Sequence, residues 1–295
     1  MKITSRAQLA LPAIFCIPLI GLAQDVPNEE RVTLRHDKGN LVVDIASGRP
    51  LGGTAEALMR EYGYAISYED PRFENRDDLV DISAEVRRDG KSGSQDARYA
   101  IWVPKTRKAV IVIPEPKSQA DIRGALAKVG TALGDGGGHF EIEEAPGYLS
   151  VVPRGIRDKN GNWSDPGSIL NTLISLSKES RYDEELVLAI CGAISSAADV
   201  KVSLGMGFVG GLTGTNGPAM YTLQADNERA GDVLVKALRL IGGGQMRQMW
   251  YLYYGSVAGE YFYAMNFYPI PARADATTQR KLSSGSKFSE NHDSD

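Results

Sequence analysis

The sequence is poor in the residues that build metal centres, disulfides and nucleophilic sites. It has two cysteines and three histidines in 295 residues. The histidines stand far apart, at positions 36, 139 and 292, without the spacing of a zinc site. Cys16 lies in an apolar N-terminal run, and Cys191 lies in an apolar stretch without a neighbouring base. We therefore predict no metal, no disulfide, and a buried, inert Cys191.

Basic runs and long apolar runs are missing as well. The net charge is -4 and the sequence pI is about 5.6, with lysines and arginines spread along the chain. These values argue against a nucleic-acid partner. After the N-terminal region no apolar run is long enough to span a bilayer, so we predict no transmembrane span in the mature chain.

The N-terminus has the pattern of a signal peptide. Lys2 and Arg6 precede an apolar run over 9–22, and small residues follow up to Ala23. We predict that residues 1–23 are a signal peptide cleaved near Ala23, and that the protein is periplasmic or secreted.

Two short patterns suggest ligand sites but lack the rest of the motif. A GxGxxG pattern over 205–210 continues into more glycine, threonine and proline, where a dinucleotide site requires a helix. The oxygen-rich stretch from Asp158 to Asp165 places Gly161 fourth, whereas an EF-hand places its glycine sixth. We predict a flexible glycine loop and an Asn-Gly turn, and no cofactor.

The rest of the chain repeats an amphipathic helix, a turn and a strand. In the first copy Thr54 is expected to cap the helix and Gly63 to end it, before a strand over 64–68. In the second, Ser118 and Asp121 form a capping-box pattern, and a hairpin follows around Pro146 and Gly147.

The third and fourth copies follow the same order. The third has a helix over 183–198 and a strand over 200–204. The fourth has Asp226 as the expected cap, an apolar stripe over 230–241, and an aromatic hairpin over 249–254 and 260–268.

A helix with one apolar stripe needs a sheet to cover it, so the copies are expected to pair. We predict an α+β protein of two tandem small modules, each with two helices packed on short mixed β-sheets in a βαββαβ-like order. The modules span 31–157 and 168–271, joined by a polar linker over 158–167 that leaves their orientation open. Residues 272–295 are polar and are expected to be disordered.

This order of elements resembles the secretin and TonB N-terminal short domain. The stretches 41–45, 50–51 and 57–68 carry the resemblance in the first half, and 122–126 with the later hairpin in the second. Residues 228–240 repeat the second half. The resemblance implies a periplasmic docking module without catalytic residues. In that family the module precedes a pore or barrel, whereas a polar tail follows here, which favours a free-standing binding protein.

Two groups of residues are candidate sites. Tyr251, Tyr253 and Phe262 share the less apolar faces of the aromatic hairpin, and we predict an exposed binding surface there. The alternative is that they pack against the first module. Alternation puts Glu141 and Glu143 on one strand face, opposite Phe140 and Ile142. Two interpretations are open: these glutamates lie on the solvent side of a strand, or they are the two acids of a catalytic site.

We expect a non-enzymatic, exported binding or scaffold protein of the cell envelope, which docks an envelope protein or peptide through sheet edges or the aromatic hairpin. The alternatives are a hydrolase of envelope material that uses Glu141 and Glu143, and an accessory component of a secretion or uptake pore. The sequence leaves the ligand and the oligomeric state open.

Overall fold

The computed structural model describes residues 31–88, 101–134, 139–145, 147–165, 167–205, 219–257 and 260–271. The predicted signal peptide, the tail after residue 271 and the glycine loop over 206–218 lie outside the described residues. Within the described ranges, no helix is both long enough and apolar enough to cross a membrane.

The fold is α+β, as predicted. The first half contains β1 (Arg31–Asp37), β2 (Asn40–Ser47), α1 (Pro50–Tyr62), β3 (Ala65–Glu69), β4 (Leu79–Asp81), α2 (Ser83–Arg88), β5 (Trp102–Pro104), β6 (Arg107–Pro114), α3 (Gln119–Leu133), β7 (His139–Ala145) and β8 (Tyr148–Arg157). The connection contains β9 (Trp163–Ser164) and the 3-10 turn η5 (Ile169–Asn171). The second half contains β10 (Leu173–Tyr182), α4 (Asp183–Ala198), β11 (Lys201–Leu204), β12 (Met220–Arg229), α5 (Ala230–Ile241), β13 (Gln248–Val257) and β14 (Glu260–Pro269).

The two halves repeat one pattern of strand pairing. In the first half β3 pairs parallel with β8, β8 pairs antiparallel with β7, and β2 pairs antiparallel with β6. In the second half β11 pairs parallel with β14, β14 pairs antiparallel with β13, and β10 pairs antiparallel with β12. Thus β7 of the first half corresponds to β13 of the second half, and β3 corresponds to β11.

One central sheet runs through both halves, in the order β11-β14-β13-β3-β8-β7, with β9 added beside β8. The halves join where β13 pairs parallel with β3, which puts Tyr251 opposite Tyr68 and Leu252 opposite Glu69. The polar linker had left the orientation open, and this pairing fixes it: the junction is an interior pair of strands.

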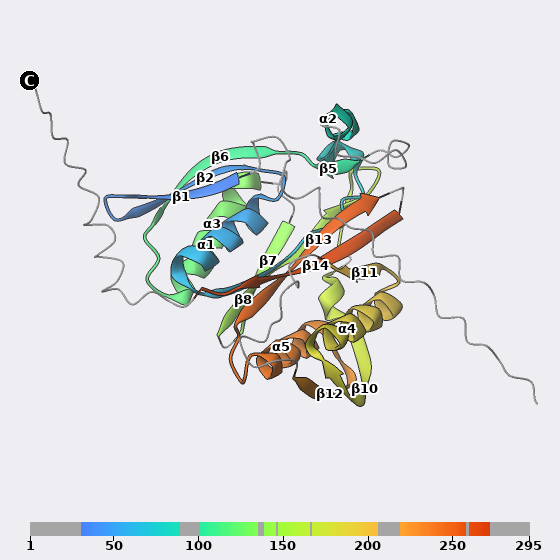
Figure 1. The fold of residues 1–295 in the computed structure, drawn as a ribbon. Coiled ribbons are helices and arrows are strands. Elements are labelled where there is room, and N and C mark those ends of the chain that lie inside the picture. The colour runs from blue at the N-terminus through green and yellow to red at the C-terminus, as the bar shows by residue number, and fades with distance from the viewer. Residues whose placement is uncertain are drawn as a thin grey trace, which may run out of the picture.

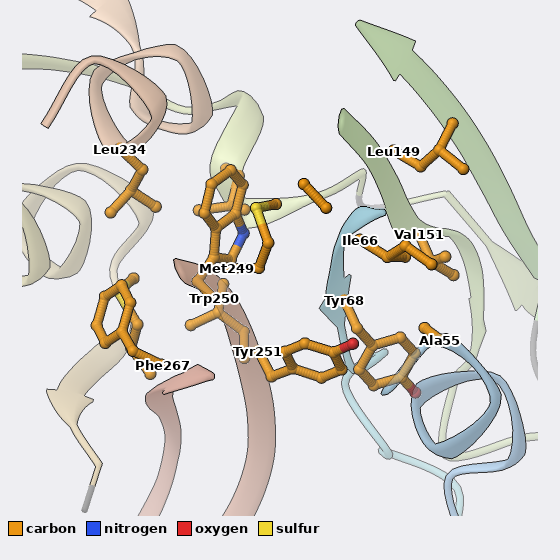
Figure 2. Close-up of a cluster of buried hydrophobic side chains, with 14 of the residues drawn as sticks. Ala55, Ile66, Tyr68, Leu149, Val151, Leu234, Met249, Trp250, Tyr251 and Phe267 are labelled. Atoms are coloured by element: carbon orange, nitrogen blue, oxygen red, sulfur yellow. The ribbon is translucent and has the colours of Figure 1, made fainter. Parts of the chain in front are cut away.

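Helices cover both faces of the central sheet (Figure 1). α1 and α3 lie between one face and the small sheet β1-β2-β6, whereas α4 and α5 lie between the other face and the pair β10-β12. In Figure 2, Leu234 of α5 and Phe267 lie on the side of β13 that carries Trp250, while Tyr251 points toward Tyr68. Both faces of β13 are therefore buried, as is usual for a strand between two helical layers.

The predicted helix ends are correct where capping chemistry decides them. Ser118 and Asp121 form the capping box of α3, and Gly63 ends α1 in the left-handed region, at φ 67°. Thr54 was predicted as a cap, but it lies inside α1, where its hydroxyl donates to the Pro50 carbonyl at 2.7 Å. The helix begins at Pro50 because proline fits the first helical position.

The predicted cap Asp226 is also wrong. It lies within β12, which stays paired with β10 as far as Arg229, opposite Leu173. α5 begins directly after this pair, at Ala230. Strand pairing with a segment distant in sequence therefore overrides the local capping preference of Asp226.

Candidate binding site

Two residues of the predicted aromatic binding surface, Tyr251 and Tyr253, lie in the junction between the halves. Tyr251 is 0% exposed and Phe262 is 9% exposed, and Tyr253 is partly buried. The Tyr251 ring lies 6.1 Å from that of Tyr68, and the Arg49 guanidinium lies 5.0 Å above the Tyr253 ring. The expected exposure is therefore wrong, and the alternative is correct: the hairpin packs against the first half because β13 is an interior strand.

A buried ion pair strengthens the same junction. The Arg49 Nε donates to Asp70 at 2.6 Å, and the same carboxylate accepts the backbone N–H of Tyr254 at 2.9 Å. The Tyr263 hydroxyl donates to the Asp70 carbonyl at 3.2 Å. Burial raises the pKa of Asp70, and the charge of Arg49 opposes this rise. The pair ties the end of β3 to both strands of the aromatic hairpin.

Glu69 is a second buried acid at this junction, with a side chain that is 0% exposed. It accepts the Ile169 N–H at 2.9 Å and a short hydrogen bond from the Ser168 hydroxyl, which hold η5 against β3. Burial raises its pKa to about 7, against the effect of these hydrogen bonds. Both carboxylate oxygens are engaged within the chain, so Glu69 supports the junction.

Glu141 and Glu143 lie on one face of β7, as the alternation predicted. Phe140 and Ile142 are half-buried toward α3, whereas Glu141 is exposed. Glu143 lies 3.6 Å from the Arg229 guanidinium. Glu143, one of the two acids proposed for hydrolysis, is therefore engaged in an ion pair. Hydrolysis by Glu141 and Glu143 stays a prediction.

A groove of about 930 Å³ opens between α3 and β7. Its apolar lining comes from Leu51, Leu126, Phe140 and Ile142, and its polar lining includes Arg123 and Arg154. The groove is open because the face of α3 that borders it carries small residues: Ala120, Gly124, Ala127 and Gly130. The apolar stripe of this helix predicts only its core side. The sequence signal for the groove is the run of small residues on the face that borders it.

The groove borders the free edge of β7. Among the described residues, none pairs with that edge. Pro153 stands opposite Phe140 and has no N–H, so the two residues cannot exchange both ladder bonds. Alternation then directs the backbone N–H groups of Ile142 and Glu144 away from β8. This edge can accept a further strand.

The remaining candidates have structural partners. Cys191 is 2% exposed, and burial raises its pKa to about 12, in agreement with an inert core thiol. The Asp158 carboxylate accepts the N–H groups of Asn160 and Asn162, which closes the predicted Asn-Gly turn. His139 stacks on Trp163 with ring centroids 3.9 Å apart. In the described part of the chain, no three His, Cys, Asp or Glu side chains form a potential metal site.

Comparison of the chain with protein-family models, with curated proteins and with solved structures finds no match. A function is therefore to be inferred from the geometry of this chain.

Proposed function

We propose that this protein is an exported, non-enzymatic binding module of the cell envelope that takes an extended polypeptide segment as an added strand on β7. One observation carries this proposal. The strand in the same position of the second half, β13, has its outer edge paired with β3, whereas the outer edge of β7 borders an open groove. Strand addition to a sheet edge is a common way of recognising extended peptides.

The side chains of β7 define the segment that fits. Glu141 and Glu143 alternate with Phe140 and Ile142 along the strand. Phe140, Ile142 and Glu141 all border the groove, and Glu143 also pairs with Arg229. A strand beside β7 alternates in the same way, so its residues meet carboxylates on one face and apolar side chains on the other. The fitting segment alternates lysine or arginine with apolar residues. Backbone hydrogen bonds supply affinity, and the alternation supplies specificity.

The N-terminal sequence supports the location. Lys2, Arg6 and the apolar run before Ala23 are typical of a signal peptide, and this pattern supports a location in the periplasm or outside the cell. The resemblance to the secretin and TonB N-terminal short domain supports a docking role in the envelope. Such a role includes docking to a pore protein that presents a basic extended segment.

A labelled peptide tests the proposal. The probe is a fluorescein-labelled heptapeptide that alternates lysine and valine, with an alternating glutamate and valine peptide as its counterpart. Fluorescence anisotropy with residues 24–295 should show saturable, salt-sensitive binding of the lysine peptide alone. The Gly124→Leu variant fills the groove, because a Cβ at Gly124 meets only open space, and should weaken binding more than about tenfold.

Gly192→Leu is the matched control. Gly192 is an exposed helical glycine in α4 whose Cβ would also meet open space, and it lies outside the groove. The control should bind as the wild type does. Equal binding by both variants, or no preference between the two peptides, would contradict docking on β7. Release of dye-labelled cell-wall fragments that disappears in the Glu141→Gln, Glu143→Gln double variant would instead support hydrolysis.

A further inference from the structure

Several sheet edges of this chain have features that discourage pairing with a neighbour. Edge strand β1 exposes Arg31, Arg35 and Asp37. On β11, the Ser195 hydroxyl accepts the Val202 N–H at 2.9 Å, so this backbone group is engaged. Charges and engaged backbone groups are usual protections of sheet edges.

β6 is an edge strand whose centre carries exposed apolar side chains in place of charges. No described strand pairs with its side away from β2. Val110 is 65% exposed and Val112 is 50% exposed, and they alternate with Ile111 and Ile113, which are buried in the core. The strand carries no charge between Lys108 and its end at Pro114. The uncharged stretch over 109–114 is a ready template for another strand.

The backbone of β6 is oriented to receive that strand. Pro114 faces Asn40 and has no N–H, so these two residues cannot exchange both ladder bonds. Alternation then turns the backbone groups of Val110 and Val112 away from β2. The Lys128 ammonium donates to the Val112 carbonyl at 2.8 Å, which agrees with this direction. An added strand would share this carbonyl with Lys128.

We propose that β6 is a dimerisation edge, and that its partner is β6 of a second copy of this chain, running antiparallel about Ile111. In this register Val110 of each copy faces Val112 of the other, so the contact occurs twice across the axis. Arg107 of each copy faces Glu115 of the other, so oppositely charged residues meet at the ends of the strand. Within its own chain Glu115 also contacts Tyr62 and His36, so Arg107 would share this carboxylate with them. The two small sheets become one continuous sheet of six strands, in the order β1-β2-β6-β6-β2-β1.

The self-complementarity favours a second copy over an unrelated strand. The apolar centre and the oppositely charged ends match when the strand meets its own reverse. Arg107 is 36% exposed and lies 3.7 Å from Asp78, so its guanidinium is accessible to a carboxylate of a second copy. A two-fold axis through Ile111 gives an isologous, closed dimer, the commonest oligomer. This surface is separate from the groove beside β7 and extends the proposed function.

Sedimentation velocity of residues 24–295 over a series of concentrations tests the dimer. The wild type should sediment as a concentration-dependent dimer. Val112→Lys and Val110→Glu should each raise the dissociation constant more than about tenfold, because each substitution acts twice across the axis. The double variant Val110→Glu, Val112→Lys should recover dimerisation, because each glutamate then faces a lysine of the other copy.

Met220→Lys is the control, since Met220 is 56% exposed on β12 and lies away from β6. It should leave the dimer unchanged. These side chains are exposed, so all variants should keep the thermal unfolding midpoint of the monomer. A wild type that stays monomeric, single variants that dimerise normally, or a double variant without recovery would overturn the proposal. Recovery of another protein on β6 in place of a second copy would overturn it too.

Discussion

The buried Glu69 predicts that stability falls as the pH rises. Its pKa is raised from 4.5 to about 7 in the folded protein. Between these values the folded protein binds a proton that the unfolded chain has released, so each pH unit lowers the free energy of unfolding. At ~1.36 kcal/mol for each unit, the full loss is about 3 kcal/mol, complete above pH 7.

Glu69→Gln removes this dependence without removing the contacts. The amide oxygen can accept the Ile169 N–H, and the amide nitrogen can donate to the Ser168 hydroxyl. Near pH 4.5 the variant and the wild type should therefore be similar in stability. Near pH 8.5 the variant should be the more stable of the two, by up to about 3 kcal/mol.

Urea unfolding measures the effect, with fluorescence of the buried Trp250 as the signal. The comparison uses the difference between the variant and the wild type at each pH, because other groups titrate as well. His36, for example, has a raised pKa from its contacts with Glu115, so its contribution is also lost as the pH rises through its folded value. A difference that stays constant from pH 4.5 to pH 8.5 would refute the assignment to Glu69.

Three further predictions concern the junction and the core. Asp70→Ala leaves the Arg49 guanidinium without its buried partner and should lower the free energy of unfolding by about 3–5 kcal/mol in the same urea assay. Asp70→Asn should lower it less. An equal loss in both variants would point to packing instead of charge. Tyr251→Ser empties a fully buried site and should destabilise the protein by about 3–5 kcal/mol. Tyr261→Ser, at a 55% exposed site, should change the stability by less than about 0.5 kcal/mol. Similar values for the two variants would contradict the burial of Tyr251. Cys191 should react with a thiol reagent at pH 8 only after denaturation, because it is buried and its pKa is raised to about 12; rapid labelling of the folded protein would show an open core.

Local sequence patterns predicted the helices well because their signals lie within a few residues. The helix over 183–198 and the capping box at Ser118 follow from apolar spacing and side-chain chemistry alone. The aromatic hairpin was also correct, since β13 and β14 alternate clearly. The strand over 107–114 was missed, although its alternation of apolar residues with Ile111 and Ile113 is present in the sequence.

The sites could not be predicted in the same way because they depend on distant partners. Whether Tyr251 is exposed depends on β3, which no local pattern links to β13. Arg49 and Asp70 meet only after α1 and β3 are in place, and Glu69 meets Ser168 only after the linker folds back. The groove beside β7 depends on the small side chains of α3, whose significance appears only when the neighbouring strand is known.

The pairing of β3 with β13 has a consequence for how the chain reaches its native state. Contacts between segments distant in sequence form late, because closing a long loop has a large entropic cost. While the chain is made in N-to-C order, the edge of β3 that faces β13 has no strand partner until residues 248–257 arrive. An unpaired edge in a half-made protein is prone to pair with the wrong chain. The first half expressed alone should therefore aggregate, and addition of the second half in trans should keep it in solution.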